Sequence, residues 1–234
     1  MTGTLALVGA GEFLDVMNGI DRELLNRSGG TRVAVLPTAS APDGAGVPDR
    51  WAKMGVDHFN ALGAQTDAVM ALDREACQDQ ALADRVNAAN LVYFSGGKPD
   101  YLFETLVDTP VWAAVKAVYD RGGVVAGCSA GAMIMGAYVP SFKMQLGLPR
   151  IVQWQPAFGL VPNSIVVPHY NEFPEFISRL MFRAPDGAMM IGVDANTALV
   201  GSNGAWTALG QLRVTLRNAG KTTRYLNGQA VPLN

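Results

Sequence analysis

The chain has 234 residues, of which 49% are hydrophobic and 16% charged, and its formal net charge is −2. This length and composition provide a core for one globular unit, so we expect residues 1–234 to form a single domain. The small charge and the pI of about 5.7 give no basic surface for nucleic acid or an anionic membrane, which favours chemistry on a small molecule or a peptide.

The first apolar run, residues 4–8, is too short to cross a bilayer, and no basic leader precedes it. We therefore expect a cytoplasmic protein. The cysteines, Cys77 and Cys128, fall in a helical segment and at the end of an apolar strand, where buried free thiols are usual. No cofactor is expected, because Leu14 stands where a dinucleotide-binding loop after the first strand needs its third glycine. No metal is expected either, because no His, Cys or carboxylate spacing suits one. The sequence carries no signal for an oligomeric state.

Apolar runs of strand length alternate with amphipathic segments of helix length, which predicts an α/β fold with three layers, a mostly parallel sheet and helices on both faces. The expected strands lie near residues 4–8, 32–36, 66–71, 90–94, 123–127, 164–167 and 189–193. The clearest helices cover 48–62, 74–89 and 110–121. After Asp194, the runs 198–200, 211–216 and 224–226 alternate with Gly and Asn, which predicts short antiparallel strands that close the edge of the sheet.

Small and polar residues follow the predicted strands at their carboxyl ends, where open α/β sheets bind their ligands. On this rim, Glu12 and Lys98 could bind the charged ends of a substrate, although solvated loop charges are the simpler interpretation. Trp154 and Phe158 could line a pocket, although buried packing is the simpler interpretation for these two. The rim segments are 9–12, 37–40, 95–98, 128–130, 168–171 and 194–196.

One rim segment has the G-x-S-x-G pattern of a nucleophile elbow, a tight turn between a strand and a helix. It follows an apolar run, precedes the helix-like residues 133–135, and reads Gly127-Cys128-Ser129-Ala130-Gly131-Ala132. Such a turn would expose Ser129 at the strand end, and the following helix would aim free N–H groups and its positive dipole end at the same place. The pattern predicts an acyl-transfer site.

A serine nucleophile needs a base, and the chain contains two histidines. His58 lies inside a helical pattern, whereas His169 follows a strand on the rim, so we expect His169 to be the base. The backbone N–H of Ala130, next to the nucleophile, is the expected first oxyanion donor. We expect Gly97 of the Gly96-Gly97 pair to be the second donor, although such a pair also occurs in an ordinary tight turn.

Four segments in this order resemble the dipeptidase E and cyanophycinase family of serine peptidases: 94–97, 127–132, 168–169 and 192–199. The resemblance covers nearly the whole chain. It implies a fold like that of class I glutamine amidotransferases, flavodoxin-like, with serine at the elbow. It also implies hydrolysis of peptide or isopeptide bonds beside aspartyl residues. On this resemblance, Ser129 matches the nucleophile, His169 the base, and Gly97 with Ala130 the oxyanion donors.

The chain departs from that family in one respect, because members have an acidic residue between the serine and the histidine, and residues 130–168 contain no Asp or Glu. A third catalytic residue normally orients the histidine, and its loss can cost about 10⁴ in rate. For Asp194 a turn or a cap is the favoured interpretation. The position stays open among Asn171, Glu172, Asp194, Gln145, Gln153, Gln155 and Asn163.

Two other interpretations remain. An α/β-hydrolase esterase has the same elbow, but its histidine comes late in the chain, and here none follows His169. A weak or silent family member that binds a peptide or metabolite would explain the missing acid, whereas an exposed serine on a sharp turn favours activity. Cations for an acidic substrate would come from Lys98, Arg150 and Arg179.

Overall fold

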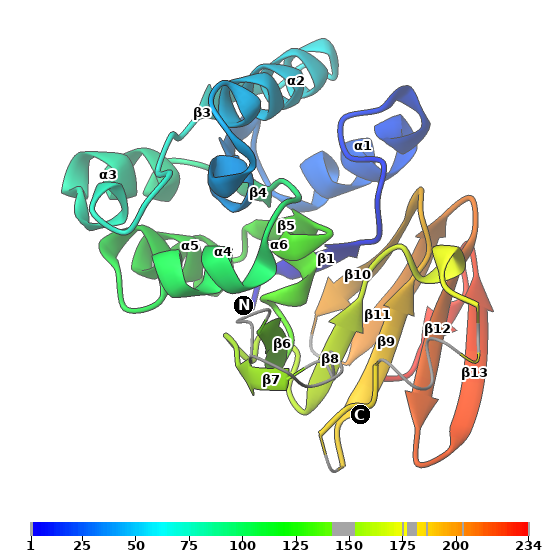
Figure 1. Ribbon diagram of the computed structural model, residues 1–234. Coiled ribbons are helices and arrows are strands. Elements are labelled where there is room, and N and C mark those ends of the chain that lie inside the picture. The colour runs from blue at the N-terminus through cyan, green and yellow to red at the C-terminus, as the bar shows by residue number, and fades with distance from the viewer. Residues whose placement is uncertain are drawn as a thin grey trace.

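A computed structural model describes residues 2–141, 153–174, 176, 182–185, 187–202 and 204–233. Its strands form one eight-stranded and one six-stranded sheet (Figure 1). Arg150, Arg179 and Gln145 lie outside the described residues. No helix in the described ranges is long and apolar enough to cross a membrane.

The first sheet has the strand order β14-β11-β10-β1-β5-β4-β2-β3. Its parallel part comprises β1 (Thr4–Val8), β2 (Arg32–Leu36), β3 (Gln65–Ala68), β4 (Leu91–Phe94) and β5 (Val124–Cys128). Apart from the polar edge strand β3, these strands are nearly continuous apolar runs, as expected for strands covered on both faces. Antiparallel strands extend it beyond β1: β10 (Thr197–Ser202), β11 (Ala205–Gly210) and β14 (Ala230–Val231).

Helices cover both faces of this sheet (Figure 1). Because side chains alternate along a strand, Leu5 and Leu7 of β1 pack into one core cluster, and Ala6 and Val8 pack into the other. The second cluster also holds side chains of α1 (Asn18–Arg27) and α2 (Val47–Ala61). The first contains side chains of α3 (Gln80–Asn87), α4 (Pro99–Leu106), α5 (Pro110–Asp120) and α6 (Ala130–Met133).

Short 3-10 helices supplement them: η1 (Asp15–Met17), η2 (Thr38–Asp43), η3 (Ala76–Gln78) and η4 (Tyr170–Glu172). The expected helix 74–89 is divided into η3 and α3, because the Asp79 carboxylate accepts the N–H of Ala81 and begins a new helix there.

The second sheet has the order β13-β12-β9-β8-β6-β7. Its strands are β6 (Tyr138–Ser141), β7 (Gln153–Pro156), β8 (Ser164–Val167), β9 (Met189–Val193), β12 (Arg213–Asn218) and β13 (Lys221–Leu226). One face of this sheet joins the first sheet's core, since Val166 and Ile191 belong to the same cluster as Leu5 and Val125. The sequence-based fold class is confirmed: a mixed α/β protein with a mostly parallel central sheet, helices and antiparallel strands.

The second sheet corrects the expected places of some strands. β8 and β9 were expected in the main sheet, and they are parallel to each other, but they pair in the second sheet. β12 and β13 were expected to close the main edge, and instead they extend the second sheet beyond β9. β8 and β9 are buried along their whole length, and such a strand has the same apolar run in either sheet, so periodicity alone could not assign them to one sheet.

Candidate active site

Ser129 occupies a strained turn between β5 and α6. Its φ of 51° and ψ of −110° are unfavourable for a residue with a side chain, and its backbone N–H donates to Val8 O at 3.0 Å. The flanking glycines are needed for space. A Cβ on Gly127 would lie 2.3 Å from the carbonyl carbon of Gly131, and one on Gly131 would lie 2.7 Å from Phe94 Cβ. The segment therefore has the backbone geometry of a nucleophile elbow.

His169 reaches Ser129 from the other sheet. It follows β8 in the left-handed conformation, with φ 49° and ψ 33°, and its Nε2 lies 3.1 Å from Ser129 Oγ. The two residues that the sequence analysis paired as nucleophile and base are therefore within hydrogen-bonding distance. His58 is elsewhere, buried in α2 with its Nε2 2.8 Å from Asp21 Oδ2.

The turn that carries His169 is fixed to the β9–β10 region by two contacts. Asn171 Oδ1 accepts the backbone N–H of Ala195 at 2.7 Å. The ring of Tyr170 lies directly over Gly192, where a Cβ would come 2.6 Å from the ring's Cγ. Gly192 therefore leaves room for the aromatic ring that precedes Asn171.

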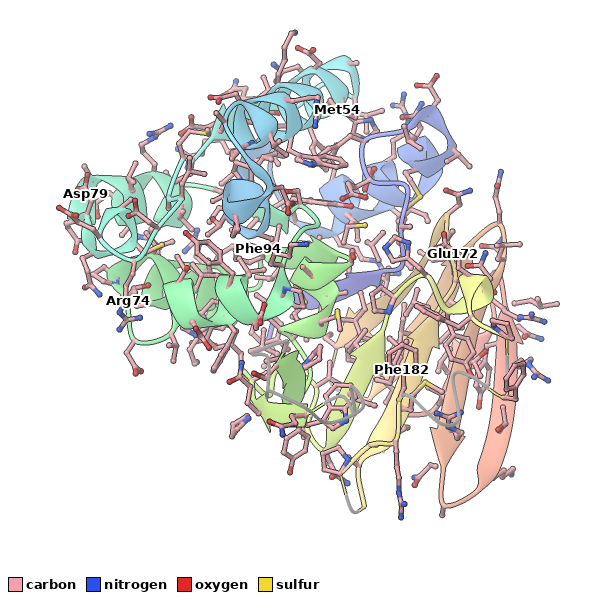
Figure 2. The ribbon with its side chains drawn as sticks, in the orientation of Figure 1. Met54, Arg74, Asp79, Phe94, Glu172 and Phe182 are labelled. Atoms are coloured by element: carbon pink, nitrogen blue, oxygen red, sulfur yellow. The ribbon has the colours of Figure 1, made fainter. Side chains whose placement is uncertain are left out.

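Glu172 is the acidic residue that faces the other side of the imidazole. Its Oε1 lies 3.6 Å from His169 Nδ1, and 60% of its side chain is exposed. Figure 2 shows Glu172 on the short helix above the strands of the second sheet. The separation is longer than a hydrogen bond, so the pair is an ion-pair contact at most when the imidazole is protonated.

The other candidates for the third position are engaged elsewhere. Asp194 is buried, and its Oδ2 lies 3.3 Å from Arg213 Nε, so the expected cap or turn role of its carboxylate is wrong. Burial raises the pKa of Asp194, and the Arg213 guanidinium opposes that rise. Asn171 binds Ala195, and the amide of Asn163 donates to Gly187 O. The remaining amides are Gln153 and Gln155 on β7, and Gln145 outside the described residues.

The loop after β4 leaves one backbone donor unused. Ser95 N–H donates to Leu36 O at 3.2 Å, Gly96 N–H to Glu12 Oε1 at 3.0 Å, and Lys98 N–H to Ala39 O at 2.7 Å. Among the described residues, the N–H of Gly97 has no acceptor.

Gly97 is confined to glycine by its surroundings. Its φ is 145°, and a Cβ there would lie 2.1 Å from Ala39 O. Within the described part of the chain, the N–H of Ala130, at the start of α6, also has no acceptor. The structure therefore supplies two free N–H groups at the sequence-predicted donor positions, and a Cβ on Gly96, next to Gly97, would lie 3.3 Å from Ser129 Cβ.

Two rim charges differ in their surroundings. The Lys98 side chain is 58% exposed, and its Nζ lies 3.5 Å from Asp43 Oδ1. Glu12 is only 8% exposed, so the interpretation of Glu12 as a solvated loop charge is wrong. Its other oxygen, Oε2, accepts from Cys128 Sγ at 2.8 Å. The sequence analysis placed Glu12 on the rim but missed that its side chain is buried and accepts hydrogen bonds from Gly96 and Cys128. Its position after β1, which neighbours β5, was the signal that could have indicated it.

Trp154 and Phe158 are packing residues. Phe158 stacks on Trp112 with ring centroids 3.4 Å apart, and Trp154 packs beside the Ile165–Val167–Met190 cluster while donating to Arg183 O.

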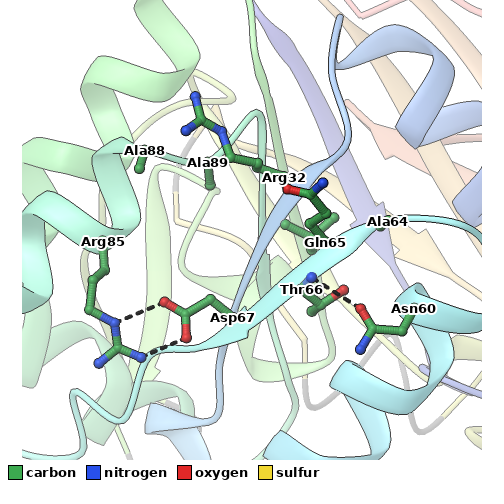
Figure 3. A pocket seen from close by; sticks show the side chains of 10 residues that line it. Arg32, Asn60, Ala64, Gln65, Thr66, Asp67, Arg85, Ala88 and Ala89 are labelled. Atoms are coloured by element: carbon green, nitrogen blue, oxygen red, sulfur yellow. Dashed lines mark hydrogen bonds and ion pairs between the residues drawn. The ribbon is translucent and has the colours of Figure 1, made fainter.

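A hollow of about 540 Å³ lies away from this site (Figure 3). Arg32 and Gln65, which line it, are the first residues of β2 and β3, so it opens at the amino ends of the parallel strands. Figure 3 shows the Arg85–Asp67 ion pair at its wall. In the described residues, no group of three or more His, Cys, Asp or Glu side chains could hold a metal ion.

A serine on a strand–turn–helix elbow, within hydrogen-bonding distance of a histidine and beside free backbone N–H groups, is the arrangement of serine hydrolases. Comparison with known proteins gives the particular family. The model of peptidase family S51 matches residues 5–209, and the chain therefore belongs to this family of serine peptidases. The resemblance to dipeptidase E and cyanophycinase is confirmed.

Curated relatives include the cyanophycinases of Trichormus variabilis and of a Nostoc species, each 28% identical over 206 residues. These matches cover 83% of this chain and 66% of each relative, so the chain spans just under two thirds of their length. A crystal structure of a peptidase from an acI-B1 Actinobacterium is 30% identical, with a TM-score of 0.89 and coverage of 99% of this chain and 97% of that one. A putative Peptidase E of Listeria monocytogenes, 17% identical with a TM-score of 0.66, covers 90% of this chain and 100% of its own and shares the fold.

Proposed function

We propose that the chain is a serine peptidase that cleaves small peptides or isopeptides beside aspartyl residues through an acyl-enzyme. The observation that carries this proposal is the 3.1 Å separation of Ser129 Oγ and His169 Nε2 on a strained elbow. The membership of peptidase family S51 supports the reaction class.

In the proposed reaction, His169 Nε2 accepts the Ser129 hydroxyl proton as Oγ attacks the substrate carbonyl carbon. The N–H groups of Gly97 and Ala130 donate to the oxyanion that forms. When the C–N bond breaks, His169 transfers the proton to the leaving amine. Water, deprotonated by His169, then attacks the ester carbonyl and releases the acid product and free Ser129.

We propose Glu172 as the residue that stabilises the imidazolium. Its carboxylate faces Nδ1, while Asp194 faces Arg213 and Asn171 faces Ala195. This assignment replaces the acid that the family has between serine and histidine with one located three residues after the histidine.

For the substrate, the curated relatives are named cyanophycinases, and the family resemblance implies bonds beside aspartyl residues. Lys98 follows the proposed oxyanion donor, and its ammonium is more than half exposed, so we propose that it attracts an acidic substrate group. Its pairing with Asp43 would have to open for this contact.

Labelling with a fluorophosphonate, a probe that phosphonylates activated serines, tests the nucleophile and the base. We expect modification at Ser129 in the wild type, none in Ser129→Ala, and none above background in His169→Ala. A wild type that folds and is not labelled would contradict the proposed activity and favour a silent binding protein. Labelling at another serine would contradict the site.

Product analysis tests the substrate class. We expect Asp-X dipeptides or β-aspartyl peptides to be hydrolysed, and simple esters to be poorer substrates at equal concentration. Lys98→Met should raise KM for the acidic peptides and leave turnover of neutral esters unchanged. Preference for esters over every peptide would instead identify an esterase.

A further inference from the structure

Glu12 contacts both the loop after β4 and the elbow that carries Ser129. It lies just after β1, and β1 pairs with β5, which ends at the elbow. One carboxylate oxygen, Oε1, accepts the Gly96 N–H at 3.0 Å. The other, Oε2, accepts the Cys128 thiol at 2.8 Å. A single buried carboxylate therefore joins the loop after β4 to the residue that precedes Ser129.

Gly96 lies close to both the Glu12 carboxylate and the Ser129 side chain. A Cβ on Gly96 would lie 3.0 Å from Glu12 Oε1 and 3.3 Å from Ser129 Cβ. The absence of a side chain on Gly96 therefore lets the loop, the nucleophile and the buried carboxylate approach one another. A shift of the Gly96 backbone would also move the adjoining peptide group of Gly97.

The other hydrogen bonds of the loop show that the Glu12–Gly96 bond fixes its centre. Ser95 and Lys98 are fixed to backbone carbonyls of Leu36 and Ala39, and Gly96 is fixed by Glu12. These bonds consume the N–H groups on both sides of Gly97. Without the Glu12 acceptor, the central peptide of the loop could rotate, and the Gly97 N–H would lose its fixed direction.

We infer that Glu12 is a positioning residue that holds the Gly96–Gly97 loop so that the Gly97 N–H faces the oxyanion. The inference rests on the proposed function, and it adds to that function a residue that contacts neither the substrate nor the reacting atoms. Glu12 acts through Gly96.

The surroundings of Glu12 agree with a fixed acceptor. Burial and the negative charge of Glu12 raise the pKa of the Cys128 thiol far above its ordinary value, so this thiol stays protonated and donates. The carboxylate thus receives one N–H and one S–H, which compensate for its removal from water.

Two substitutions separate positioning from folding. Glu12→Gln retains an oxygen that can accept the Gly96 N–H, whereas Glu12→Met fills a similar volume and has only a thioether sulfur, a weak acceptor. Glu23→Met, on the exposed surface of α1, is the matched control. For each variant we would measure the maximal rate of fluorophosphonate labelling at Ser129, the probe concentration that gives half of that rate, and the melting temperature.

Glu12→Met is expected to lower the maximal labelling rate by about 10- to 100-fold, below the ~10²- to 10³-fold cost of losing an oxyanion donor outright. The half-saturating probe concentration should stay unchanged. Glu12→Gln should retain a rate within about threefold of wild type, because one hydrogen bond is preserved. Equal rates in Glu12→Met and Glu23→Met, or equal losses in the Met and Gln variants, would overturn the inference.

Hydrogen exchange gives a readout that does not depend on activity. The Gly96 amide should exchange faster in Glu12→Met and keep its protection in Glu12→Gln and Glu23→Met. Unchanged protection in Glu12→Met would overturn the inference. If wild type is not labelled but the exchange differs as expected, the proposed function fails and the loop-holding role of Glu12 stands.

Discussion

Two acidic residues beside the neighbours of Ser129 have opposite surroundings. Glu12 is buried and receives two hydrogen bonds, whereas Glu172 is mostly exposed and faces the far nitrogen of His169 at 3.6 Å. An exposed charge at that distance is screened by water and contributes little energy. We therefore expect Glu172 to stabilise the His169 imidazolium less than a buried acid would.

Replacing Glu172 tests this difference. Glu172→Gln should lower the labelling rate at Ser129 by about 10-fold or less, compared with about 10⁴ when a buried triad aspartate is neutralised. Glu75→Gln, at an exposed position before η3, is the control and should match wild type. Labelling kinetics at fixed pH measure both. A loss as large as that of His169→Ala would show that Glu172 carries the full role of a third catalytic residue.

The buried Cys77 thiol should make the unfolding free energy depend on pH. Burial, with Asp73 adding to it, raises the pKa of Cys77 from 9.0 to about 11. The unfolded chain therefore releases this proton at lower pH than the folded chain, so Cys77 favours unfolding progressively as pH rises from about 9 to about 11.

Cys77→Ala removes this titration. Urea unfolding of both proteins at several pH values should show that the wild type's stability relative to Cys77→Ala falls as pH increases through this window. The difference between the two proteins cancels the other titrating groups. A constant difference from pH 8 to pH 10.5 would contradict the expectation.

At the scale of elements, the loop between β4 and α4 depends on the backbone of Gly97. Gly97→Ala places a Cβ 2.1 Å from Ala39 O at a φ of 145°, so the loop has to move. We expect labelling at Ser129 to fall by about 10²-fold, as for a lost oxyanion donor.

Gly122→Ala is the matched control for that substitution. Gly122 also has a positive φ, 98°, but a Cβ there meets nothing within 4 Å, and the turn lies at the amino end of β5, away from the elbow. It should lower the unfolding free energy by about 1 kcal/mol and leave labelling unchanged. Equal labelling in the two variants would contradict a role for Gly97.

The turn after β8 predicts a second effect at this scale. Asn171→Ala removes the acceptor of the Ala195 N–H and frees the segment that presents His169, so labelling should decrease by about 10-fold. Asn171→Asp keeps an acceptor oxygen and should retain most of the rate. Labelling kinetics with both variants at one temperature check this, and identical losses would exclude the hydrogen bond as the cause.

The elements show what the sequence could and could not specify. β1, β2, β8 and β9 begin and end where their apolar runs do. β6 was not anticipated, because Pro140 lies inside it and weakens the strand pattern. The division into two sheets was not predictable, because it depends on which strands pair, and pairing is a long-range property.

The candidate site was predictable from the sequence where its geometry depends on short segments. The elbow at Ser129 and the glycine turn at Gly97 have short patterns with a physical reason for each residue. The proposed role of Glu12 was not predictable, because it depends on burial and on contacts with segments far along the chain, whereas Glu172 stayed one of several candidates for the third position. At the scale of the whole molecule, the site lies where the two sheets meet, with Ser129 on one and His169 on the other.

The other histidine, His58, joins α1 and α2 on one face of the first sheet. His58 on α2 and Asp21 on α1 form a buried pair with atoms 2.8 Å apart, on the face of the first sheet opposite the second sheet. Burial raises the pKa of Asp21, and its contacts with His58 oppose this rise. Removing His58 alone would leave the aspartate buried without its partner.

His58→Ala should therefore lower the unfolding free energy by about 3–5 kcal/mol, and the double variant with Asp21→Asn should lose less than the sum of the single losses. Urea unfolding of the four proteins measures this coupling. Below its melting temperature, His58→Ala should still be labelled at Ser129 at a rate close to wild type, because the His58 ring packs against Phe13 and Phe59 of the second core cluster, whereas His169 follows β8 of the second sheet. A folded His58→Ala that is not labelled would instead indicate that His58 takes part in catalysis. A loss of stability with labelling retained would show that His58 stabilises the fold and would leave His169 as the base for Ser129.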